Sequence, residues 1–224
     1  DGACRIEQLV ERVSDLGQTS CALTDHGVMY GVIDFYRACK AKGIHPVIGC
    51  EVYLAPHSRH ERGYVNGEWN SHLILLCENM TGYKNLIHMV SLAFSEGFYM
   101  KPRIDMELLR EHSEGLICMS ACLAGAIPRA IANSNMDKAY EICEEFLEIF
   151  DREHFYLEIQ DHGIEEQKKV NEGLYQLAKE LNLELVATND AHYLTRADAR
   201  TQDILMAIQM GKTVDDPTRM KFET

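Results

Sequence analysis

Short apolar runs that alternate with segments of helical periodicity constrain this 224-residue chain more than any other feature. Strands are predicted at 21–23, 47–55, 72–77, 116–120, 155–160 and 183–188. Apolar residues recur at helical spacing near 6–16, 30–42, 81–94, 105–112, 126–133, 136–150, 165–181 and 196–210. This alternation favours parallel βα units, and such units close into a barrel. We therefore expect an α/β barrel.

Polar residues follow the first and the last of these strands. Asp25 and His26 come directly after the first strand, and Asp190 and His192 come after the last. In an α/β barrel the functional residues lie at the C-terminal ends of the strands, so the two pairs are expected to share one site. Either pair alone has a simpler explanation, because an Asp after a strand often caps the next helix. Their repetition favours the shared site.

Further candidates for the same site have less certain roles. Glu51 lies inside an apolar strand, where a carboxylate is costly unless it is paired or ligates a metal. Cys122 follows a strand but resembles a buried core thiol, and His162, beside Asp161, also fits an ordinary loop residue. His72 begins its strand instead of ending it, so either that strand runs the opposite way or the histidine approaches from a loop.

The third predicted helix gives a specific expectation about capping and burial. Thr81 is its expected N-cap. Its expected buried face consists of Leu86, Ile87, Val90, Ala93 and Phe94. The tail at 213–224 has no periodicity and is predicted to be a linker after a domain at 1–212.

The candidate side chains define the chemistry. Imidazoles, carboxylates and one thiol suit Zn²⁺, Mn²⁺ or Fe²⁺ better than Mg²⁺, which prefers oxygen ligands alone. Carboxylates can bridge two or three such ions, and paired ions stabilise both oxygens of a phosphoester displacement. The sequence has no serine nucleophile elbow, no P-loop and no Gly-x-Gly-x-x-Gly motif, so acyl transfer and nucleotide cradling have no support.

Charge and cysteine content limit the partners and the cellular compartment expected for the chain. The formal net charge is −13, from 35 acidic and 22 basic residues, so the overall field does not attract nucleic acid. A polyanionic substrate would need bound metal ions or neighbouring domains to supply positive charge. Eight cysteines without a Cys-x-x-Cys pair indicate a reducing cytoplasm. No apolar run approaches the ~18 residues of a membrane span.

A loop near the middle of the chain combines aromatic and basic residues. Lys101 and Arg103 lie in this loop, at 97–105. They are candidates for contacts to a phosphate backbone, with solvated loop charges as the alternative. His162 is a third candidate for substrate binding.

Seven motifs together resemble a known family. They are Ala-Leu-Thr-Asp-His-Gly at 22–27, Ile-Gly-Cys-Glu at 48–51, Lys-Pro-Arg-Ile-Asp at 101–105, Ser-Ala-Cys-Leu-Ala-Gly at 120–125, Leu-Glu-Ile-Gln-Asp-His-Gly at 157–163, Val-Ala-Thr-Asn-Asp-Ala-His at 186–192 and Gly-Lys-Thr-Val-Asp-Asp-Pro at 211–217. The chain resembles the PHP (polymerase and histidinol phosphatase) domain over nearly its whole length. The motifs after Thr-Asp-His resemble the branch at the N-terminus of bacterial DNA polymerase III alpha subunits.

The resemblance implies a fold and a metal site. The family fold is a distorted seven-stranded (β/α) barrel that holds up to three divalent ions, with zinc expected here and manganese or iron as alternatives. The implied ligands are Asp1, His26, Glu51, His72, Cys122, Asp190 and His192, of which His26, Asp190 and His192 are also implied to be catalytic. The family's first strand, a His-x-His motif before the position of Asp1, is missing from this chain, and with it two ligands.

The resemblance also implies a function for the intact protein. Members that keep their ligands resemble 3′→5′ proofreading exonucleases, in which metal-activated water attacks the terminal phosphodiester of a DNA 3′ end. A non-catalytic scaffold or docking domain is the first alternative, and a free-standing histidinol-phosphatase-like enzyme is the second. Nucleotidyl transfer would belong to polymerase domains downstream of Thr224. Those domains and other replicase subunits are the expected partners, with no membrane involved.

Overall fold

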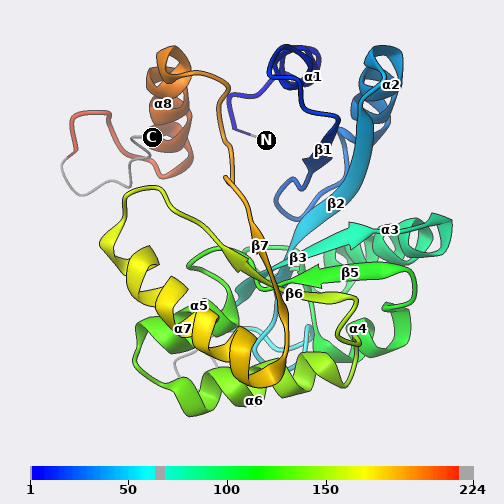
Figure 1. Ribbon diagram of the computed structural model, residues 1–224, viewed down its shortest axis with the longest axis vertical. Coiled ribbons are helices and arrows are strands. Elements are labelled where there is room, and N and C mark those ends of the chain that lie inside the picture. Colours follow the sequence, from blue (N-terminus) through cyan, green and yellow to red (C-terminus); the bar gives the residue numbers. More distant parts are fainter. Residues whose placement is uncertain (1, 64–68, 217–224) are drawn as a thin grey trace.

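The computed structural model describes residues 2–63 and 69–216 and has a single curled sheet wrapped by helices (Figure 1). The strands are β1 (Ser20–Leu23), β2 (His45–Leu54), β3 (Ser71–Cys77), β4 (Arg103–Ile104), β5 (Leu116–Met119), β6 (Phe155–Ile159) and β7 (Glu184–Ala187). The helices are α1 (Ile6–Asp15), α2 (Val32–Lys42), α3 (Met80–Ser95), α4 (Met106–His112), α5 (Ala126–Ala132), α6 (Met136–Leu147), α7 (Glu165–Leu181), the 3₁₀ turn η1 (Arg196–Asp198) and α8 (Ala199–Gln209).

The sheet order confirms the predicted α/β barrel class with one strand reversed. The strands lie in the order β1-β2-β3-β5-β6-β7, and the short β4 pairs with β2. The pairs β1–β2, β5–β6 and β6–β7 are parallel, whereas β3 is antiparallel to both β2 and β5. The reversal of β3 confirms the first explanation offered for His72. The N-terminal end of β3 lies at the same edge of the sheet as the C-terminal ends of its neighbours.

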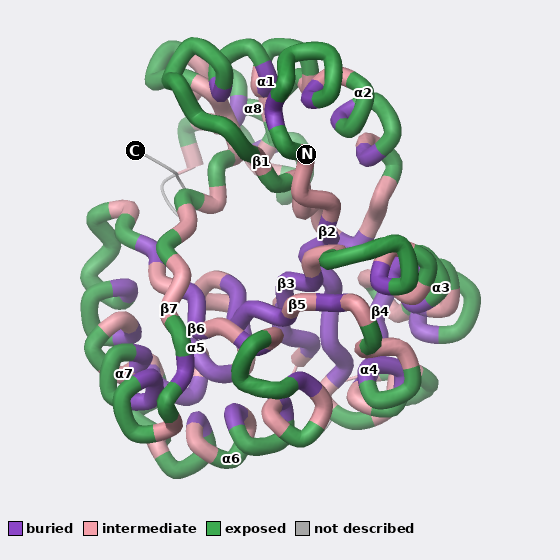
Figure 2. The backbone as a smooth tube through the Cα atoms, turned by 45° about the vertical axis from the view of Figure 1, so that its right-hand side comes forward, coloured by how far each residue is buried: buried purple, intermediate pink, exposed green. Residues whose placement is uncertain are grey.

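The curl of the sheet leaves β1 and β7 on opposite sides of an opening (Figure 2). Within residues 2–63 and 69–216 no backbone pairing joins these two strands. β2 connects β1 to the rest of the sheet, because its first half pairs with β1 and its second half with β3 and β4. The sheet is therefore a partly closed barrel whose two edge strands face one another.

Two separate apolar cores hold the helices against the outside of the sheet. The larger core joins β2, β3, β5 and β6 to helices α3 to α7. The smaller core joins α1 and α2 to β1 through Val10, Val13, Phe35, Cys39 and Ile44. Apolar residues at helical spacing place Phe35 and Cys39 on one buried face of α2.

A third, small cluster lines the inside of the curl. Ile74 of β3, Met119 of β5 and Ala121 are buried there. Alternate residues of a strand point to opposite faces, so β3 gives Leu73 and Leu75 to the outer core and Ile74 to the inside. The inner face is therefore left for side chains from strand ends.

Several local predictions need correction. Asn79, not Thr81, caps α3, because its side chain accepts hydrogen bonds from the amides of Thr81 and Gly82. Ile87 and Phe94 are exposed instead of buried, since α3 presents a narrower apolar face to the core than predicted. The strand β4 was not predicted, and two residues are too few to give a periodic signal. Most of the predicted linker, 217–224, lies outside the described residues.

Candidate metal centre

The register between β2 and β3 places two of the predicted ligands on the inner face. Glu51 pairs with Ile74, and Tyr53 pairs with His72. Glu51 and His72 are therefore diagonal neighbours two residues apart in register, and their side chains project from the same face. His72 Nδ1 forms an ion pair with Glu51 Oε1. The ladder fixes this contact because a shift of one residue would move Glu51 to the other face.

A tight turn after β1 brings in the third side chain. The Glu51 amide donates to Asp25 O at 3.1 Å, and the Gly27 amide donates to Glu51 O at 2.9 Å. His26 lies between these two hydrogen bonds. Gly27 has a φ of +68°, and a Cβ there would lie 2.9 Å from the Pro102 ring, so the turn requires glycine. The result is that His26 Nε2 lies 3.5 Å from Glu51 Oε2.

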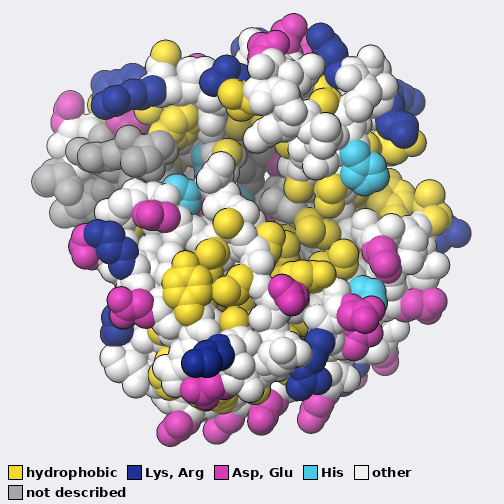
Figure 3. Space-filling model, viewed as in Figure 1, with side chains coloured by type: hydrophobic (Ala, Val, Ile, Leu, Met, Phe, Trp, Pro, Cys, Tyr) yellow, Lys and Arg dark blue, Asp and Glu magenta, His cyan; other side chains and the backbone are white. Residues whose placement is uncertain are grey.

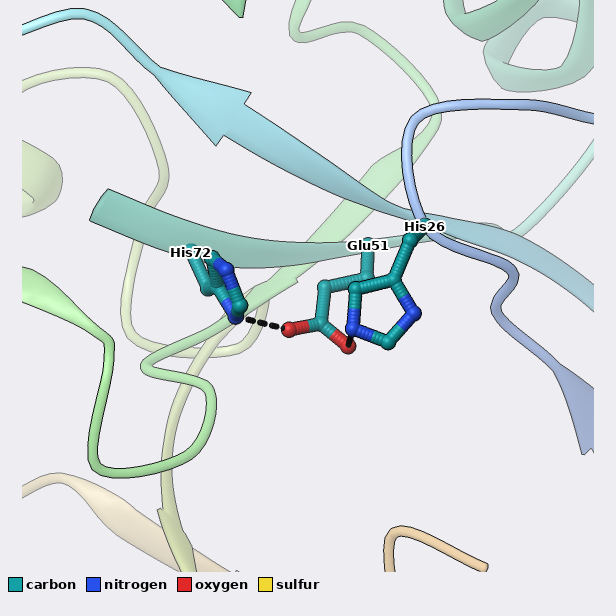
Figure 4. Close-up of side chains that lie close together, drawn as sticks. All are labelled: His26, Glu51 and His72. Carbon is teal, nitrogen blue, oxygen red and sulfur yellow. Dashed lines mark ion pairs between the residues drawn. The ribbon is translucent and has the colours of Figure 1, made fainter. Parts of the chain in front are cut away.

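These three residues form a compact cluster (Figure 4). One oxygen of the Glu51 carboxylate points toward His72 and the other toward His26. One ligand atom from each residue lies within 4.8 Å of the other two. Glu51 is only 4% exposed, and the two imidazoles are half-buried. Two imidazoles around a buried carboxylate are a donor set suited to a divalent cation such as zinc.

Cys122 reaches the same cluster from the loop after β5. Its sulfur lies 3.5 Å from His72 Nδ1 and 3.9 Å from Glu51 Oε1. The loop turns sharply, since Ala121 has a φ of +63° and a Cβ on Gly125 would lie 2.1 Å from Ser120 O. The structure thus brings Cys122 to Glu51 and His72, as the ligand prediction requires.

The electrostatics of the cluster favour an ionised Glu51. Burial opposes the charge, but the hydrogen bond from His72 and the nearby His26 and His192 lower the pKa of Glu51 below its usual range. Burial, together with the charge of Glu51, raises the pKa of the Cys122 thiol to about 12. A metal that binds Cys122 sulfur would therefore have to displace its proton.

Asp190 and His192 lie across the same cavity. The His26 and His192 ring centroids are 5.7 Å apart. His192 Nδ1 donates to Asp190 O at 2.8 Å, so the ring proton is on Nδ1. Asp190 has a φ of +43°, an uncommon conformation for a residue with a side chain. Both residues belong to the turn that follows β7.

Five of the seven predicted ligands line one cavity of about 600 Å³, and His72 contacts it through Glu51 and Cys122. Figure 3 shows the molecule hollowed between the α8 side and the α1 side, with histidines at the edge of the hollow. His26, Glu51, Cys122, Asp190 and His192 all line this cavity. Asp1, the remaining predicted ligand, lies outside the described residues.

Lys101 and Arg103, two of the three residues predicted to bind substrate, lie in different surroundings. Lys101 Nζ lies 5.2 Å from the ring centroid of Tyr53, whose ring is edge-on to His72, so its charge is near the cluster. Arg103 is 4% exposed and donates to the carbonyls of Gly97, Arg59 and Glu61. The buried guanidinium of Arg103 therefore stabilises the surrounding loop backbone through these hydrogen bonds.

Three residues beside the cluster were not predicted from the sequence. Tyr53 packs its ring against His72 at 5.2 Å, and burial raises its pKa to about 12. Glu158 of β6 is 5% exposed and lines the cavity, as does Gln160 just after β6. Alternation along the strands could have found Tyr53, since it is two residues from Glu51. Glu158 also stands inside an apolar strand, the signal that singled out Glu51.

Comparison with family models decides the relationship. The model of the PHP domain matches residues 1–162.

The chain belongs to the PHP domain family.

Relatives of known name extend this relationship to the whole chain. The DNA polymerase III subunit alpha of Treponema pallidum is 45% identical over 225 residues, which span 100% of this chain and 19% of that protein. The subunit alpha of Thermus aquaticus is 44% identical over 228 residues, 99% of this chain and 18% of that protein. This PHP domain chain thus spans about a fifth of the length of these curated relatives.

Solved structures show the same fold at low sequence identity. A protein of Bifidobacterium adolescentis assigned to the metal-dependent phosphoesterases matches with a TM-score of 0.57 and 14% identity, over 86% of this chain and 84% of that one. An amidohydrolase of Chromobacterium violaceum solved with sulfate and no metal matches with a TM-score of 0.53 and 12% identity, over the same shares. These matches establish the curled α/β fold of the PHP domain.

Proposed function

We propose that this chain is the PHP domain of the alpha subunit of a bacterial replicative DNA polymerase, and that its site hydrolyses phosphodiesters with divalent metal ions. The observation that carries the proposal is the cluster of His26, Glu51, His72 and Cys122 at one cavity, which Asp190 and His192 line from the other side. The close relatives named as polymerase III alpha subunits support the assignment to that parent protein.

The donor set fits a divalent metal. Glu51, buried and placed between two imidazoles, would hold the ion with His26 and His72, and Cys122 would add a thiolate. Asp190 and His192 would complete the opposite wall. Divalent ions bound there supply Lewis-acid stabilisation of a phosphoryl group and lower the pKa of water. Zinc is the proposed metal because imidazole and thiolate ligands favour it, with manganese or iron as alternatives.

The chain's own side chains would bind and orient the substrate. The Lys101 ammonium, held over the Tyr53 ring, is placed to contact a phosphate beside the cluster. This local positive charge matters because the domain as a whole carries −13. The proposed substrate is the 3′ end of DNA, hydrolysed in the 3′→5′ direction in the intact protein. Proofreading would then occur within the same polypeptide that synthesises DNA.

The proposed partners are the other domains of the parent chain. α8 exposes Ile204, Leu205 and Ile208 and buries few of its residues. It therefore presents an uncovered apolar face, of the kind that marks an interaction site. About four-fifths of the length of each relative lies outside the part that this chain matches, so further domains are available to cover that face. DNA and other replicase subunits complete the proposed set. In the described residues no helix is both long and apolar enough to cross a membrane.

The test is cleavage of a DNA duplex with a mismatched 3′ end by the full polymerase subunit. The polymerase active site should first be inactivated, and metal content measured in the same preparations. Wild type should release the mismatched nucleotide, Asp190→Ala and His26→Ala should not, and Lys101→Met should raise KM more than it lowers kcat. His88→Ala, on α3 outside the cavity, is the matched control. Stoichiometric metal without cleavage by wild type would contradict the exonuclease and favour the scaffold.

A further inference from the structure

A chain of hydrogen bonds runs from the floor of the cavity to the turn that carries Asp190. Gln160 Nε2 donates to Glu158 Oε1 at 2.9 Å, and Gln167 Nε2 lies 3.5 Å from Gln160 Oε1. Gln167 Nε2 donates to His162 Nδ1 at 2.8 Å, and His162 Nε2 lies 2.7 Å from Asn189 O. The chain ends at the peptide group directly before Asp190.

The donors and acceptors in this chain fix the tautomer of His162. The His162 amide, which can only donate, lies 2.8 Å from Gln167 Oε1, so the oxygen of that side chain faces the backbone. The amide nitrogen of Gln167 therefore faces the ring and donates to Nδ1. Since Nδ1 accepts, the ring proton is on Nε2, where it is donated to Asn189 O. Gln167 is 5% exposed, so the end of the chain that selects the tautomer is buried, whereas the contact with Asn189 O lies near the surface.

The last hydrogen bond acts on a strained residue. The carbonyl of Asn189 belongs to the same planar peptide as the amide of Asp190, so holding the carbonyl restricts rotation about φ of Asp190. That φ is +43°, a conformation that a residue with a side chain keeps only when its surroundings impose it. The backbone hydrogen bonds nearest to Asp190 lie two residues away on either side, from the Thr188 amide to Ile159 O and from the Ala3 amide to His192 O.

We propose that His162 is a positioning residue that holds Asp190 in its metal-facing conformation through the Asn189 carbonyl. This role replaces the substrate contact predicted for His162, since both ring nitrogens already have protein partners. The inference rests on the proposed function, because Asp190 is a ligand only if the cavity binds metal. Glu158, Gln160 and Gln167 form the support for His162, and their role is to select one tautomer.

Variants of two residues separate the hydrogen bonds. His162→Phe removes both ring contacts, whereas His162→Gln keeps a donor close to the position of Nε2. Gln167→Leu removes the partner that selects the tautomer. His154→Phe is the matched control, because His154 is a histidine outside the cavity whose partners are Asp151 and Glu78.

The first measurement needs no metal. Imidazole ¹⁵N shifts in the 224-residue chain should show His162 protonated on Nε2 and unprotonated on Nδ1. The amide signals of residues 189–192 should shift or broaden in His162→Phe and Gln167→Leu, remain near wild type in His162→Gln, and not respond to His154→Phe. An Nδ1-protonated His162, or an unchanged turn in His162→Phe, would overturn the proposal.

The second measurement is zinc affinity by competition with a chromophoric chelator. His162→Phe should weaken binding by ~10- to 100-fold, the range for partners that orient metal ligands, and His162→Gln should recover most of the loss. Equal affinity of His162→Phe and wild type would also overturn the proposal. A wild type that binds no zinc would contradict the proposed function instead, and the metal-free measurement would still decide whether His162 holds the turn.

Discussion

The cavity has two walls that hold their polar side chains by different means. On one wall Glu51 and His72 project from a β-ladder, and their contact follows from the register of β2 and β3. On the other wall Asp190 and His192 lie in a turn after the edge strand β7, with a positive φ at Asp190. A continuous strand ladder holds the first wall, whereas the second combines side-chain hydrogen bonds with the backbone hydrogen bond from the Ala3 amide to His192 O.

Two buried carboxylates in the cavity, both on strands, differ in the same way. Glu51 has an imidazole beside each oxygen, and its pKa is lowered despite burial. Glu158 is as deeply buried, and burial raises its pKa. Both hydrogen bonds of Glu158 go to Oε1, while Oε2 has no partner among the described residues. Both carboxylate oxygens of Glu51 thus have partners, and one oxygen of Glu158 does not.

The largest expected effect is on metal binding by the strand wall. Glu51→Gln keeps the shape of the side chain but removes the charge that two imidazoles face, so zinc affinity should fall by more than the ~100-fold upper range for outer-shell partners. Chelator competition measures it. Glu78→Gln, a half-exposed carboxylate just after β3, is the control and should bind like wild type. If Asp190→Asn weakens binding more than Glu51→Gln does, the strand wall is not the principal metal site.

The second effect tests whether backbone pairing holds the strand wall. A Cβ on Gly49 would lie 2.6 Å from Leu75 O, inside the ladder between β2 and β3. Gly49→Ala should therefore push the strands apart and destabilise the domain by about 1–3 kcal/mol, the usual cost of overpacking. Urea unfolding measures this, and zinc affinity should fall with it.

Gly43→Ala provides the comparison for Gly49→Ala. Gly43 ends α2 with a φ of +72° and has open space around its Cβ position, so alanine there costs only backbone strain. This variant should lose stability but keep wild-type zinc affinity. If both variants lower zinc affinity equally, general destabilisation explains the result and the ladder has no special role.

The third effect separates strain from charge in the turn wall. Asn tolerates a left-handed backbone better than Ala, so Asp190→Asn should keep nearly the stability of wild type, while Asp190→Ala should lose ~1 kcal/mol. Both variants lose the carboxylate, so both should weaken zinc binding. Thermal unfolding of the metal-free chain measures the difference. Equal stability of the two variants would show that the turn imposes no strain on residue 190.

The same contrast explains what could be predicted from sequence. Glu51 stood out because a carboxylate in an apolar strand requires a partner, and the strand that carries it was found by its periodicity. His72 was harder, because local pattern does not reveal strand direction, and only the pairing with β2 and β5 places it at the site. The fold class followed from the alternation of strands and helices together with the family motifs.

The turn wall shows where sequence reasoning reaches its limit. Asp190 and His192 were found as a repeated motif, but the network that holds them joins residues 158 to 189 through side-chain contacts. No spacing rule encodes these contacts, because they depend on how α7 packs beside β6 and β7. Arg103 illustrates the same limit, since its sequence neighbours gave no sign that three backbone carbonyls surround it.

The smallest expected effect is a pH dependence that arises from Glu158. Burial, with added repulsion from Asp190 and Glu51, raises its folded pKa above the usual 4.5, so the folded state binds this proton more tightly than the unfolded state does. The resulting stability is present below pH 4.5 and is lost as pH rises through the folded pKa. Glu158→Gln cannot ionise, and its Nε2 would take the place of the unpartnered Oε2. The variant should therefore have a higher melting temperature than wild type at pH 8 and the same melting temperature near pH 4.

Zinc should shrink the difference in melting temperature at pH 8, because a cation in the cavity offsets the charge of Glu158. A constant difference across pH would mean that the ionisation of Glu158 does not destabilise the folded state.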